Sequence, residues 1–398
     1  MMDETMRLSD LCDFVGVQVD PANHADGVYV GLEHVASGRF VRSGEGKASD
    51  VVSGKYLFQG GDLLYGKLRP YLDKAVLATD SGICTTELLV LRPKEGVDPR
   101  FLVGVVHAPA FIEHAVAGTT GVQHPRTSWG HIANFELPAF DSEEQAKIAN
   151  LLWEVHDAIA SNEAAVEAGG DLKRAAMRAL FTKGLRGEAQ KEAEIGPVPE
   201  SWGIPTVAES VRPFRFDRSK QIPKSAYREA GGWPIVDQGQ QEIAGYTDDA
   251  EKVITPNQPI IIFGDHTRAF KFVDFPFTLG ADGTKPLLAR EGFNPRFLFH
   301  VLSALDIPAR GYNRHYTVLS EMRLPYPAPD EQREIVAVLD AIDRKIDLHR
   351  RKRAVLDELF KALLRKLMTG EIRVSDLDLT ALSPDPTPAA KPTAEVAA

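Results

Sequence analysis

The side chains of this chain that could do chemistry are mainly cations, amides and aromatic rings gathered in a few short segments. In the densest segment, residues 211–228, one acid, Asp217, stands against six cations: Arg212, Arg215, Arg218, Lys220, Lys224 and Arg228. Phe214, Phe216 and Tyr227 lie between them. A local basic patch with interleaved rings is the footprint expected of a surface that tracks a nucleic-acid backbone. The net charge of −10 does not argue against this, because it describes the whole molecule and the footprint is local.

Further loops repeat this composition in both halves of the chain. The second half has Arg310, Tyr312, Asn313, Arg314, His315 and Tyr316. The first half has Lys67, Arg69, Tyr71 and Lys74, and a glycine-flanked loop with Thr119, Thr120, Gln123, His124 and Arg126. In the major groove arginine pairs with guanine, and Asn or Gln with adenine, through two hydrogen bonds. We expect Asn313 and Arg314 to read base edges, with Arg310 and His315 near phosphates. Each side chain alone is best interpreted as a solvated surface group, so the prediction rests on their clustering.

Motifs for catalysis or for a resident cofactor are missing. The sequence has no Gly-Lys-Ser/Thr phosphate loop, no glycine fingerprint for a dinucleotide and no Asn/Asp-Pro-Pro-aromatic motif for transfer of a methyl group to a base. Asp330 and the stretch Asp343–Lys345 resemble the sequence motif of a nuclease active site only superficially, because they fall inside a predicted helix. A metal site around Asp265 and His266 is not favoured either, since the eleven histidines do not cluster. We therefore predict a protein that is not an enzyme and holds no metal or cofactor of its own.

One segment of the chain occurs twice, and it must position these loops. Residues 137–186 align without a gap on residues 324–373, and thirteen of the fifty positions are identical. The identities include Leu-Pro, at Leu137 and Leu324, and Glu-Gln, at Glu144 and Glu331. The sequences between the two copies show almost no kinship. Two similar segments that carry two different bodies predict two different surfaces on one symmetric frame.

The repeated segment is predicted to be a long helix. In the second copy, apolar residues recur in a 4-3-4-3 rhythm at Ile335, Leu339, Ile342, Ile346, Leu356, Phe360, Leu363 and Leu367. The first copy keeps the register at Ile148, Leu152, Val155, Ile159, Val166, Ala176 and Leu180. This period favours two helices that pack on each other over two helices that each cover only their own domain. Each would be about 60 Å long.

Both ends of the helices carry expected signals, and the middle of the first carries a weakness. Asp141 or Ser142 can cap the first helix, acidic residues open the second, and Thr369-Gly370 can end it. The pair Gly169-Gly170 costs about 1 kcal/mol per glycine relative to alanine, so we expect a kink or a frayed turn there.

Each body has an α/β or mainly β texture. In the first body we expect strands at 29–32, 62–65, 74–78 and 87–91; in the second, at 233–236, 260–263 and 271–273. Asp98-Pro99-Arg100-Phe101-Leu102 resembles Asn294-Pro295-Arg296-Phe297-Leu298, and each leads into a capped helix. The two bodies are therefore expected to share a fold while differing in surface.

Composition bounds the class of protein. A chain of 398 residues with 43 % hydrophobic and 26 % charged residues predicts more than one globular domain. No apolar run suits a membrane span and no leader is recognisable, so we expect a cytoplasmic protein with no membrane partner. Cys12 and Cys84 are expected to be reduced and buried. The proline- and alanine-rich end, residues 374–398, is predicted to be a disordered tail.

The order of these parts resembles the specificity subunit of type I restriction–modification systems. In both halves of the chain a variable body is followed by Leu-Pro and then by a helix that contains Glu-Gln-x-x-Ile. The resemblance also rests on the stretches 61–70, 194–202, 262–268, 280–285 and 367–373. It covers nearly the whole chain. One departure is that the first body begins at Met6–Asp10 without the Pro-Glu-Ser-Trp opening of the second.

The resemblance implies an α+β fold with two target recognition domains, at 1–140 and 187–325, joined by two long antiparallel coiled-coil helices at 141–186 and 326–373 with pseudo-two-fold symmetry. Each domain would read one half of a split site on double-stranded DNA, and Arg268 and Lys285 would join the DNA-binding residues. The helices would set the spacing and dock two modification subunits, which use S-adenosylmethionine, and restriction motor-nuclease subunits would complete the complex. Half-sites read from one face would lie about 34 Å apart.

Two other functions stay open on the sequence alone. The chain could be a scaffold whose two bodies bind proteins or glycans, with the helices serving oligomerisation. A single-chain methyltransferase is the weaker third reading, because no catalytic motif is present. Binding to duplex DNA that weakens steeply with salt would separate the first reading from the scaffold.

Overall fold

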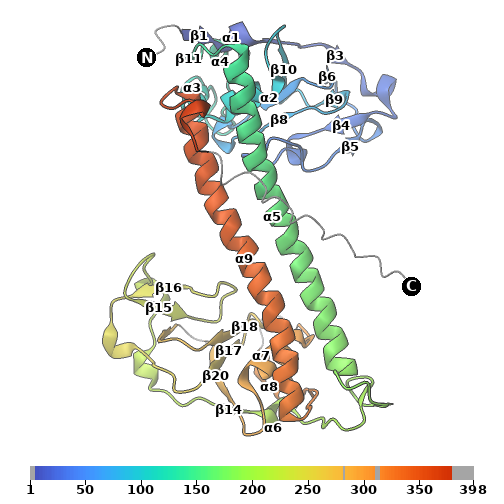
Figure 1. Cartoon of the computed structure of the whole chain (residues 1–398), viewed down its shortest axis with the longest axis vertical. Helices are drawn as coiled ribbons and strands as arrows, with labels where there is room; N and C mark the ends of the chain where they lie inside the picture. The colour runs from blue at the N-terminus through green and yellow to red at the C-terminus, as the bar shows by residue number, and fades with distance from the viewer. Residues whose placement is uncertain (1–4, 281–282, 310–313, 379–398) are drawn as a thin grey trace, which may run out of the picture. The chain divides into compact units, whose positions relative to one another are not determined.

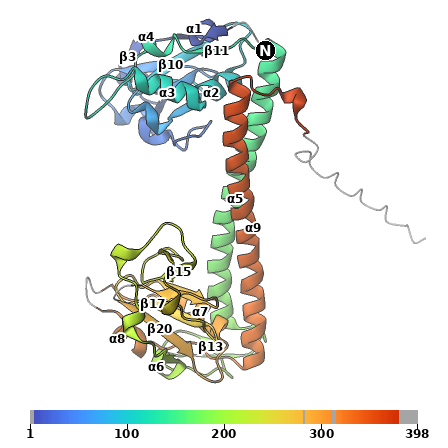
Figure 2. The ribbon, with the colours of Figure 1, turned by 90° about the vertical axis from the view of Figure 1, so that its left-hand side faces the viewer.

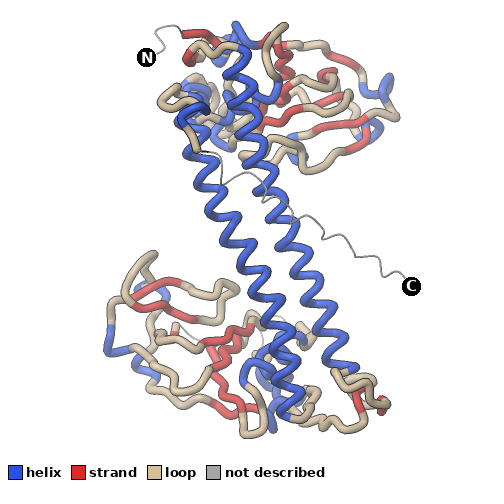
Figure 3. The backbone as a smooth tube through the Cα atoms, in the orientation of Figure 1, coloured by secondary structure: helices blue, strands red, loops and turns tan. Residues whose placement is uncertain are grey.

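The computed structural model describes residues 5–280, 283–309 and 314–378, and the chain forms two compact units of mixed helix and sheet. Unit 1 comprises residues 1–163 and 351–398, and unit 2 comprises residues 164–350. Two long helices, α5 (Ser142–Lys183) and α9 (Pro329–Met368), each contribute one segment to each unit. They are the green and orange helices of Figure 1. Strands occur in the two bodies, whereas α5 and α9 are helical throughout (Figure 3).

The body of unit 1 contains two main sheets. The first has the strand order β2-β10-β7-β8, with all pairs antiparallel, and the second has the order β3-β6-β9-β4-β5. The strands are β1 (Thr5–Arg7), β2 (Cys12–Phe14), β3 (Gln18–Val19), β4 (Val28–Val30), β5 (Gly46–Lys47), β6 (Lys55–Phe58), β7 (Leu63–Gly66), β8 (Ala75–Leu77), β9 (Gly82–Cys84), β10 (Leu88–Pro93) and β11 (Glu136–Pro138). The helices are α1 (Leu8–Leu11), α2 (Pro99–His107), α3 (Pro109–Ala117) and α4 (Trp129–Ile132).

The body of unit 2 repeats the first of these sheets. Its strand order is β14-β20-β17-β18, again with all pairs antiparallel, beside a smaller sheet β16-β15-β19. The strands are β12 (Gln190–Lys191), β13 (Val198–Pro199), β14 (Val211–Pro213), β15 (Trp233–Val236), β16 (Gly245–Thr247), β17 (Ile260–Gly264), β18 (Phe270–Val273), β19 (Thr278–Leu279) and β20 (Thr284–Ala289). The helices are α6 (Val207–Ser210), α7 (Pro295–Ala304) and α8 (Tyr316–Glu321). The matching order confirms that the two bodies share a fold.

Equivalent helices cover these sheets. The Asp98 carboxylate accepts from the N–H of Arg100 at 2.8 Å and caps α2, and the Asn294 amide oxygen accepts from the N–H of Arg296 at 2.9 Å and caps α7. Both caps were predicted from the sequence. Helix α7 contacts β18, and it lies against β17 and β20 (Figure 2). Phe101 and Phe297, at the same place in α2 and α7, are fully buried and anchor the two cores.

In unit 1 the start of α5 packs against the end of α9. Ile148, Leu152 and Leu367 share one buried core with the body. A Cβ added at Gly104 would meet Met368 at 2.8 Å and Leu152 at 3.1 Å, so both helices reach the same point of α2. Further along, Glu163 of α5 pairs with Arg353 of α9 at 3.1 Å. The two segments therefore run antiparallel, and they pack both on each other and on their body.

In unit 2 the part of α5 from residue 164 onward packs antiparallel to the part of α9 up to residue 350. Lys173 pairs with Asp343 at 2.7 Å, and Arg186 pairs with Glu334 at 2.7 Å. A Cβ at Gly169 would lie 2.7 Å from the side chain of Ile346. The kink or frayed turn predicted at Gly169-Gly170 is wrong: α5 is helical through both residues. The glycine lets the two helices approach closely, which offsets its low helix propensity.

The ends of the helices explain the repeated Glu-Gln pair. Glu331, near the start of α9, accepts from the backbone N–H of Leu185 just after α5, at 2.7 Å. Glu144, near the start of α5, accepts from the N–H of Val374 beyond α9, at 3.3 Å. Each repeat thus holds the far end of the other helix. The neighbouring Gln145 and Gln332 both donate to the carbonyl oxygen five residues before them, at 3.0 and 2.9 Å.

Helix boundaries agree closely with the sequence patterns. Asp141, rather than Ser142, caps α5 by accepting from the N–H of Glu144 at 2.8 Å. After α9, Gly370 adopts the predicted left-handed conformation with φ +66°. Residues 374–376, assigned to the tail from the sequence, form a short 3₁₀ helix in which Val374 is buried, and residues 379–398 lie outside the described residues. Among the described residues, no helix has the length and apolarity that crossing a membrane requires.

Candidate nucleic-acid interface

The predicted site residues of unit 1 meet where strand β7 ends. The N–H of Lys67 donates to the carbonyl of Glu87, which precedes β10, at 3.0 Å. The Lys67 carbonyl accepts from the N–H of Thr127, which precedes α4, at 3.0 Å. Leu68 and Arg126 form an antiparallel bridge beside these bonds. The loop 119–126 is therefore fixed against the end of the central sheet.

Side chains brace this loop from both sides. The Arg126 guanidinium donates to both carboxylate oxygens of Glu87, at 2.9 to 3.2 Å. This contact raises the pKa of Arg126 above its usual value. Arg69, with φ +50°, donates through its N–H to the carbonyl of Pro125 at 2.7 Å and through Nη2 to that of Gln123 at 3.3 Å. Arg69 and Arg126 therefore hold the loop in addition to adding charge beside it.

The tip of the loop is exposed. Val122 is 100 % exposed, and Gln123 and His124 are exposed beside it. The structure thus brings together six of the residues predicted in this unit, namely Lys67, Arg69, Thr120, Gln123, His124 and Arg126. Sequence reasoning missed Glu87, which pairs with Arg126 across 39 residues of chain. No local pattern marks such a partner.

Unit 2 repeats this backbone arrangement with other side chains. The N–H of Asp265, at the end of β17, donates to the carbonyl of Gly283 at 2.8 Å. The Asp265 carbonyl accepts from the N–H of His315 at 3.1 Å. Lys67, Glu87 and Thr127 of unit 1 make the same two bonds. The same scaffold therefore carries a lysine and a glutamate in one unit and an aspartate and a glycine in the other.

Asp265 organises the candidate site of unit 2. It is 1 % exposed, and its Oδ1 accepts from the N–H groups of His315 and Tyr316, each at 2.8 Å. Lys285 lies 3.9 Å from its other carboxylate oxygen and over the Tyr316 ring. Burial and the Asp265 charge raise the pKa of Tyr316. Sequence reasoning considered Asp265 only as a metal ligand and missed its role as the acceptor for the N–H groups of His315 and Tyr316.

The other predicted residues of unit 2 are dispersed. Arg268, with φ +61°, follows β17 and donates to the carbonyl of Ile307 at 2.7 Å. Arg314 is exposed next to His315. Arg215, Arg218 and Lys220 are exposed on the segment after β14. Arg310, Tyr312 and Asn313 lie outside the described residues.

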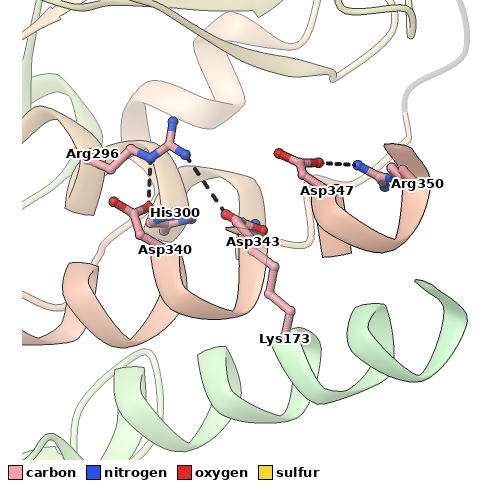
Figure 4. Close-up of polar contacts among 7 residues, drawn as sticks. All are labelled: Lys173, Arg296, His300, Asp340, Asp343, Asp347 and Arg350. Carbon is pink, nitrogen blue, oxygen red and sulfur yellow. Dashed lines mark hydrogen bonds and ion pairs between the residues drawn. The ribbon is translucent and has the colours of Figure 1, made fainter. Parts of the chain in front are cut away.

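A possible metal-binding group lies elsewhere in unit 2. His300 of α7 and Asp340 and Asp343 of α9 offer ligand atoms within 4.8 Å of one another (Figure 4). However, Arg296 pairs with Asp340 at 3.0 Å, and Lys173 pairs with Asp343 at 2.7 Å. These two cations neutralise both carboxylates, so a metal ion would have to displace them. We interpret the group as an ion network that ties α7 and α5 to α9.

His300 is the unusual member of this network. It is fully buried, and neither ring nitrogen makes a hydrogen bond to the described part of the chain. Its Nε2 lies 3.5 Å from Asp340. Burial, followed by the charges of Lys173 and Arg296, lowers the pKa of His300 to about 4. The imidazole is therefore neutral at pH 7.

Known proteins resemble this chain over most of its length. Residues 213–358 match the family model of the type I restriction modification DNA specificity domain. A putative type I restriction enzyme MjaX specificity subunit from Methanocaldococcus jannaschii is 25 % identical over 351 residues, which are 82 % of each chain. The MjaVIII specificity subunit of the same organism is 25 % identical over 289 residues, 65 % of this chain and 67 % of that one.

Solved structures show the same fold. The type I restriction–modification system S subunit from M. genitalium matches with a TM-score of 0.60 at 17 % identity, covering 92 % of this chain and 96 % of that chain. A chain from a structure of the complex assembly and conformational transition of the type I R-M system matches with a TM-score of 0.55 at 22 % identity, covering 93 % and 98 %. The family-model match and the curated relatives confirm the resemblance predicted from the sequence: residues 213–358 are similar to the type I restriction modification DNA specificity domain, and the chain is similar over most of its length to a putative type I specificity subunit.

Proposed function

We propose that this protein is the sequence-specific DNA-recognition subunit of a type I restriction–modification complex, with each unit reading one half of a bipartite site. The observation that carries the proposal is the shared sheet order with different side chains at the same place. Lys67 and Glu87 in unit 1 stand where Asp265 and Gly283 stand in unit 2. Two readers of one design with different contact groups suit a site whose two halves differ in sequence.

The long helices would join and space the two readers. In this proposal α5 and α9 form an antiparallel coiled coil with pseudo-two-fold symmetry, and its length sets the distance between half-sites. Support comes from each unit by itself, where segments of both helices pack antiparallel and where Glu144 and Glu331 make equivalent bonds. Because the two ends of the helix pair make equivalent contacts, they could each bind one copy of the same partner, here the modification subunit.

The proposal assigns the chemistry to partners. The modification subunits would bind S-adenosylmethionine and methylate adenine, and motor-nuclease subunits would complete the restriction complex. This chain would contribute DNA contacts and no catalytic group. The proposal also places the protein in the cytoplasm beside the DNA, where its two buried free thiols, Cys12 and Cys84, would stay reduced.

The test is to express the chain with its modification subunit and map methylated bases in the host DNA. We expect one asymmetric, split motif, and no methylation without this chain. Binding of the complex to a duplex with that motif should weaken steeply with salt, because phosphate contacts release counterions. Methylation with no motif, or assembly without DNA binding, would contradict the proposal. The latter outcome would favour the scaffold for proteins or glycans.

A further inference from the structure

We infer that the loop 119–126 of unit 1 reads an A·T base pair, with Gln123 hydrogen-bonded to adenine and Val122 packed on the thymine methyl group. The inference rests on the proposed function and adds to it the kind of base pair that this unit reads. It is carried by three properties of the loop, which are its bracing, the exposure of its tip and the chemistry of the side chains there.

The loop is held in one conformation by contacts at its base. Thr120 and Arg126 exchange backbone hydrogen bonds at 3.0 and 2.9 Å, as in a short β-hairpin. The Arg126–Glu87 fork and the two bonds from Arg69 add side-chain braces on both flanks. A reader that is already ordered loses little conformational entropy on binding, so its contacts translate into affinity and discrimination.

The turn at the tip has little freedom. Gly121 has φ +93°, a region that side chains rarely adopt, and a Cβ there would lie 3.2 Å from the carbonyl oxygen of His124. Pro125 restricts the other side of the turn. Between them, Val122 is wholly exposed and Gln123 and His124 are exposed. An apolar side chain held in solvent on a braced turn gains most when a partner covers it.

The side chains at the tip match adenine and thymine better than guanine and cytosine. A glutamine amide offers one donor and one acceptor, which pair with N7 and the amino group of adenine in the major groove. A valine supplies methyl groups that can contact the thymine methyl. The arginines that could read guanine are engaged, because Arg126 binds Glu87 and Arg69 donates to the Gln123 carbonyl. The tip, residues 121–125, contains no arginine or lysine.

Base analogues test each contact separately in the assembled complex with its modification subunit. The duplex carries the mapped motif, and single bases of unit 1's half-site other than the methylated adenine are replaced. Uracil in place of thymine removes only the methyl group, and 7-deazaadenine in place of adenine removes only the N7 acceptor. The proteins are wild type, Val122→Ala, Gln123→Ala and the control Val52→Ala. Val52 is 95 % exposed in the same unit but outside the loop.

For the wild type and for Val52→Ala, we expect uracil at one position to weaken binding about three- to fivefold. This factor corresponds to the free energy gained by burying one methyl group. Val122→Ala should bind the thymine and uracil duplexes equally. We expect 7-deazaadenine to weaken wild-type binding by about five- to a hundredfold at one position, and Gln123→Ala to lose that difference. These paired losses would support the inference.

The failures of the two proposals can be told apart. If the complex showed no split motif, the proposed function would fall and this inference with it. If the complex recognised a motif but neither analogue affected wild-type binding at any position of unit 1's half-site, only the A·T assignment would be overturned. A half-site with no A·T pair beyond the methylated adenine would overturn it as well.

Discussion

The Glu331 carboxylate accepts the backbone N–H of Leu185 at 2.7 Å, so the first turn of one long helix satisfies a donor just beyond the end of the other. The second oxygen of Glu331 accepts from the indole N–H of Trp202 at 3.0 Å. Glu331 is only 3 % exposed. Within unit 2 this single side chain therefore joins α5, α9 and the opening of the body.

The first prediction concerns the stability that this carboxylate provides. Glu331→Gln places an amide N–H₂ against one of two donors, so we expect a loss of about 2–3 kcal/mol in the free energy of unfolding of unit 2, the value of buried hydrogen bonds to a charged group. Glu334→Gln is the matched control, because Glu334 is half-exposed and pairs with Arg186 at the surface. Its substitution should cost much less free energy of unfolding, because solvent screens the exposed pair. Urea unfolding followed by tryptophan fluorescence checks both, and equal effects would contradict the role of Glu331.

The second prediction is a pH dependence that originates at His300. Its folded pKa, about 4, lies below the ordinary value of 6.5, so the unfolded chain binds the proton more tightly. The stabilising effect of the neutral ring is therefore complete above about pH 6.5 and is lost as the pH falls towards 4. The free energy of unfolding should fall by about 3 kcal/mol in all because of this histidine.

Substitution of the histidine isolates this contribution. His300→Phe should remove that part of the slope of unfolding free energy between pH 6.5 and 4, whereas His266→Phe, at an exposed position of unit 2, should leave it in place. Urea unfolding at a series of pH values measures the slope. An unchanged slope in His300→Phe would mean that other groups set the acid sensitivity.

A third prediction separates two roles of Arg126. If Arg126 braces the loop, Glu87→Ala frees its guanidinium, loosens the loop and weakens binding to the cognate motif, with no change in the salt slope. If Arg126 were instead a phosphate contact, Glu87→Ala would strengthen binding to all sequences. The dependence of the binding constant on salt concentration would then steepen by about one released counterion. We expect the first result. Titrations of cognate and unrelated duplexes at several salt concentrations decide between them.

The fourth prediction concerns the modular division of the chain. Replacing residues 187–323 with the corresponding body of a known type I specificity subunit should change one half of the methylated motif and leave the other half intact. The reason is that the contacts of each unit's loops are made within that unit, as Arg126 pairs with Glu87 and the backbone of His315 bonds to Asp265. Sequencing of methylated bases gives the result, and alteration of both halves together would refute modularity.

The fifth prediction contrasts two cations of unit 2. Arg314→Ala should cost about 1–3 kcal/mol of DNA-binding free energy and relax selectivity at one base pair, because Arg314 is next to His315, which is bonded to Asp265 at the end of β17. Lys220→Ala should weaken binding to all sequences alike and reduce the salt slope, as a phosphate contact does. Both residues are exposed, so folding should be little affected. Unchanged affinity and selectivity in Arg314→Ala would remove this residue from base reading.

The repeat and its periodicity determined most of the frame. The 4-3-4-3 rhythm predicted both long helices, and capping residues such as Asp141 and Gly370 placed their ends, because these signals are local in the chain. The similar stretches at 98–102 and 294–298, each leading into a capped helix, predicted that the bodies share a fold. Gly169 was misjudged because helix propensity is also local, whereas the close approach of Ile346 is a tertiary contact.

For the candidate site, the sequence determined which residue types gather in each half of the chain, and the tertiary structure decided what each one contacts. Local composition placed Arg126 among the cations of the site, and the family resemblance placed Lys285 there. Only the fold shows that Glu87 pairs with the first and that buried Asp265 lies beside the second. Such pairs join residues on neighbouring strands and loops, and their geometry follows from sheet register and loop closure, which no spacing in the sequence encodes.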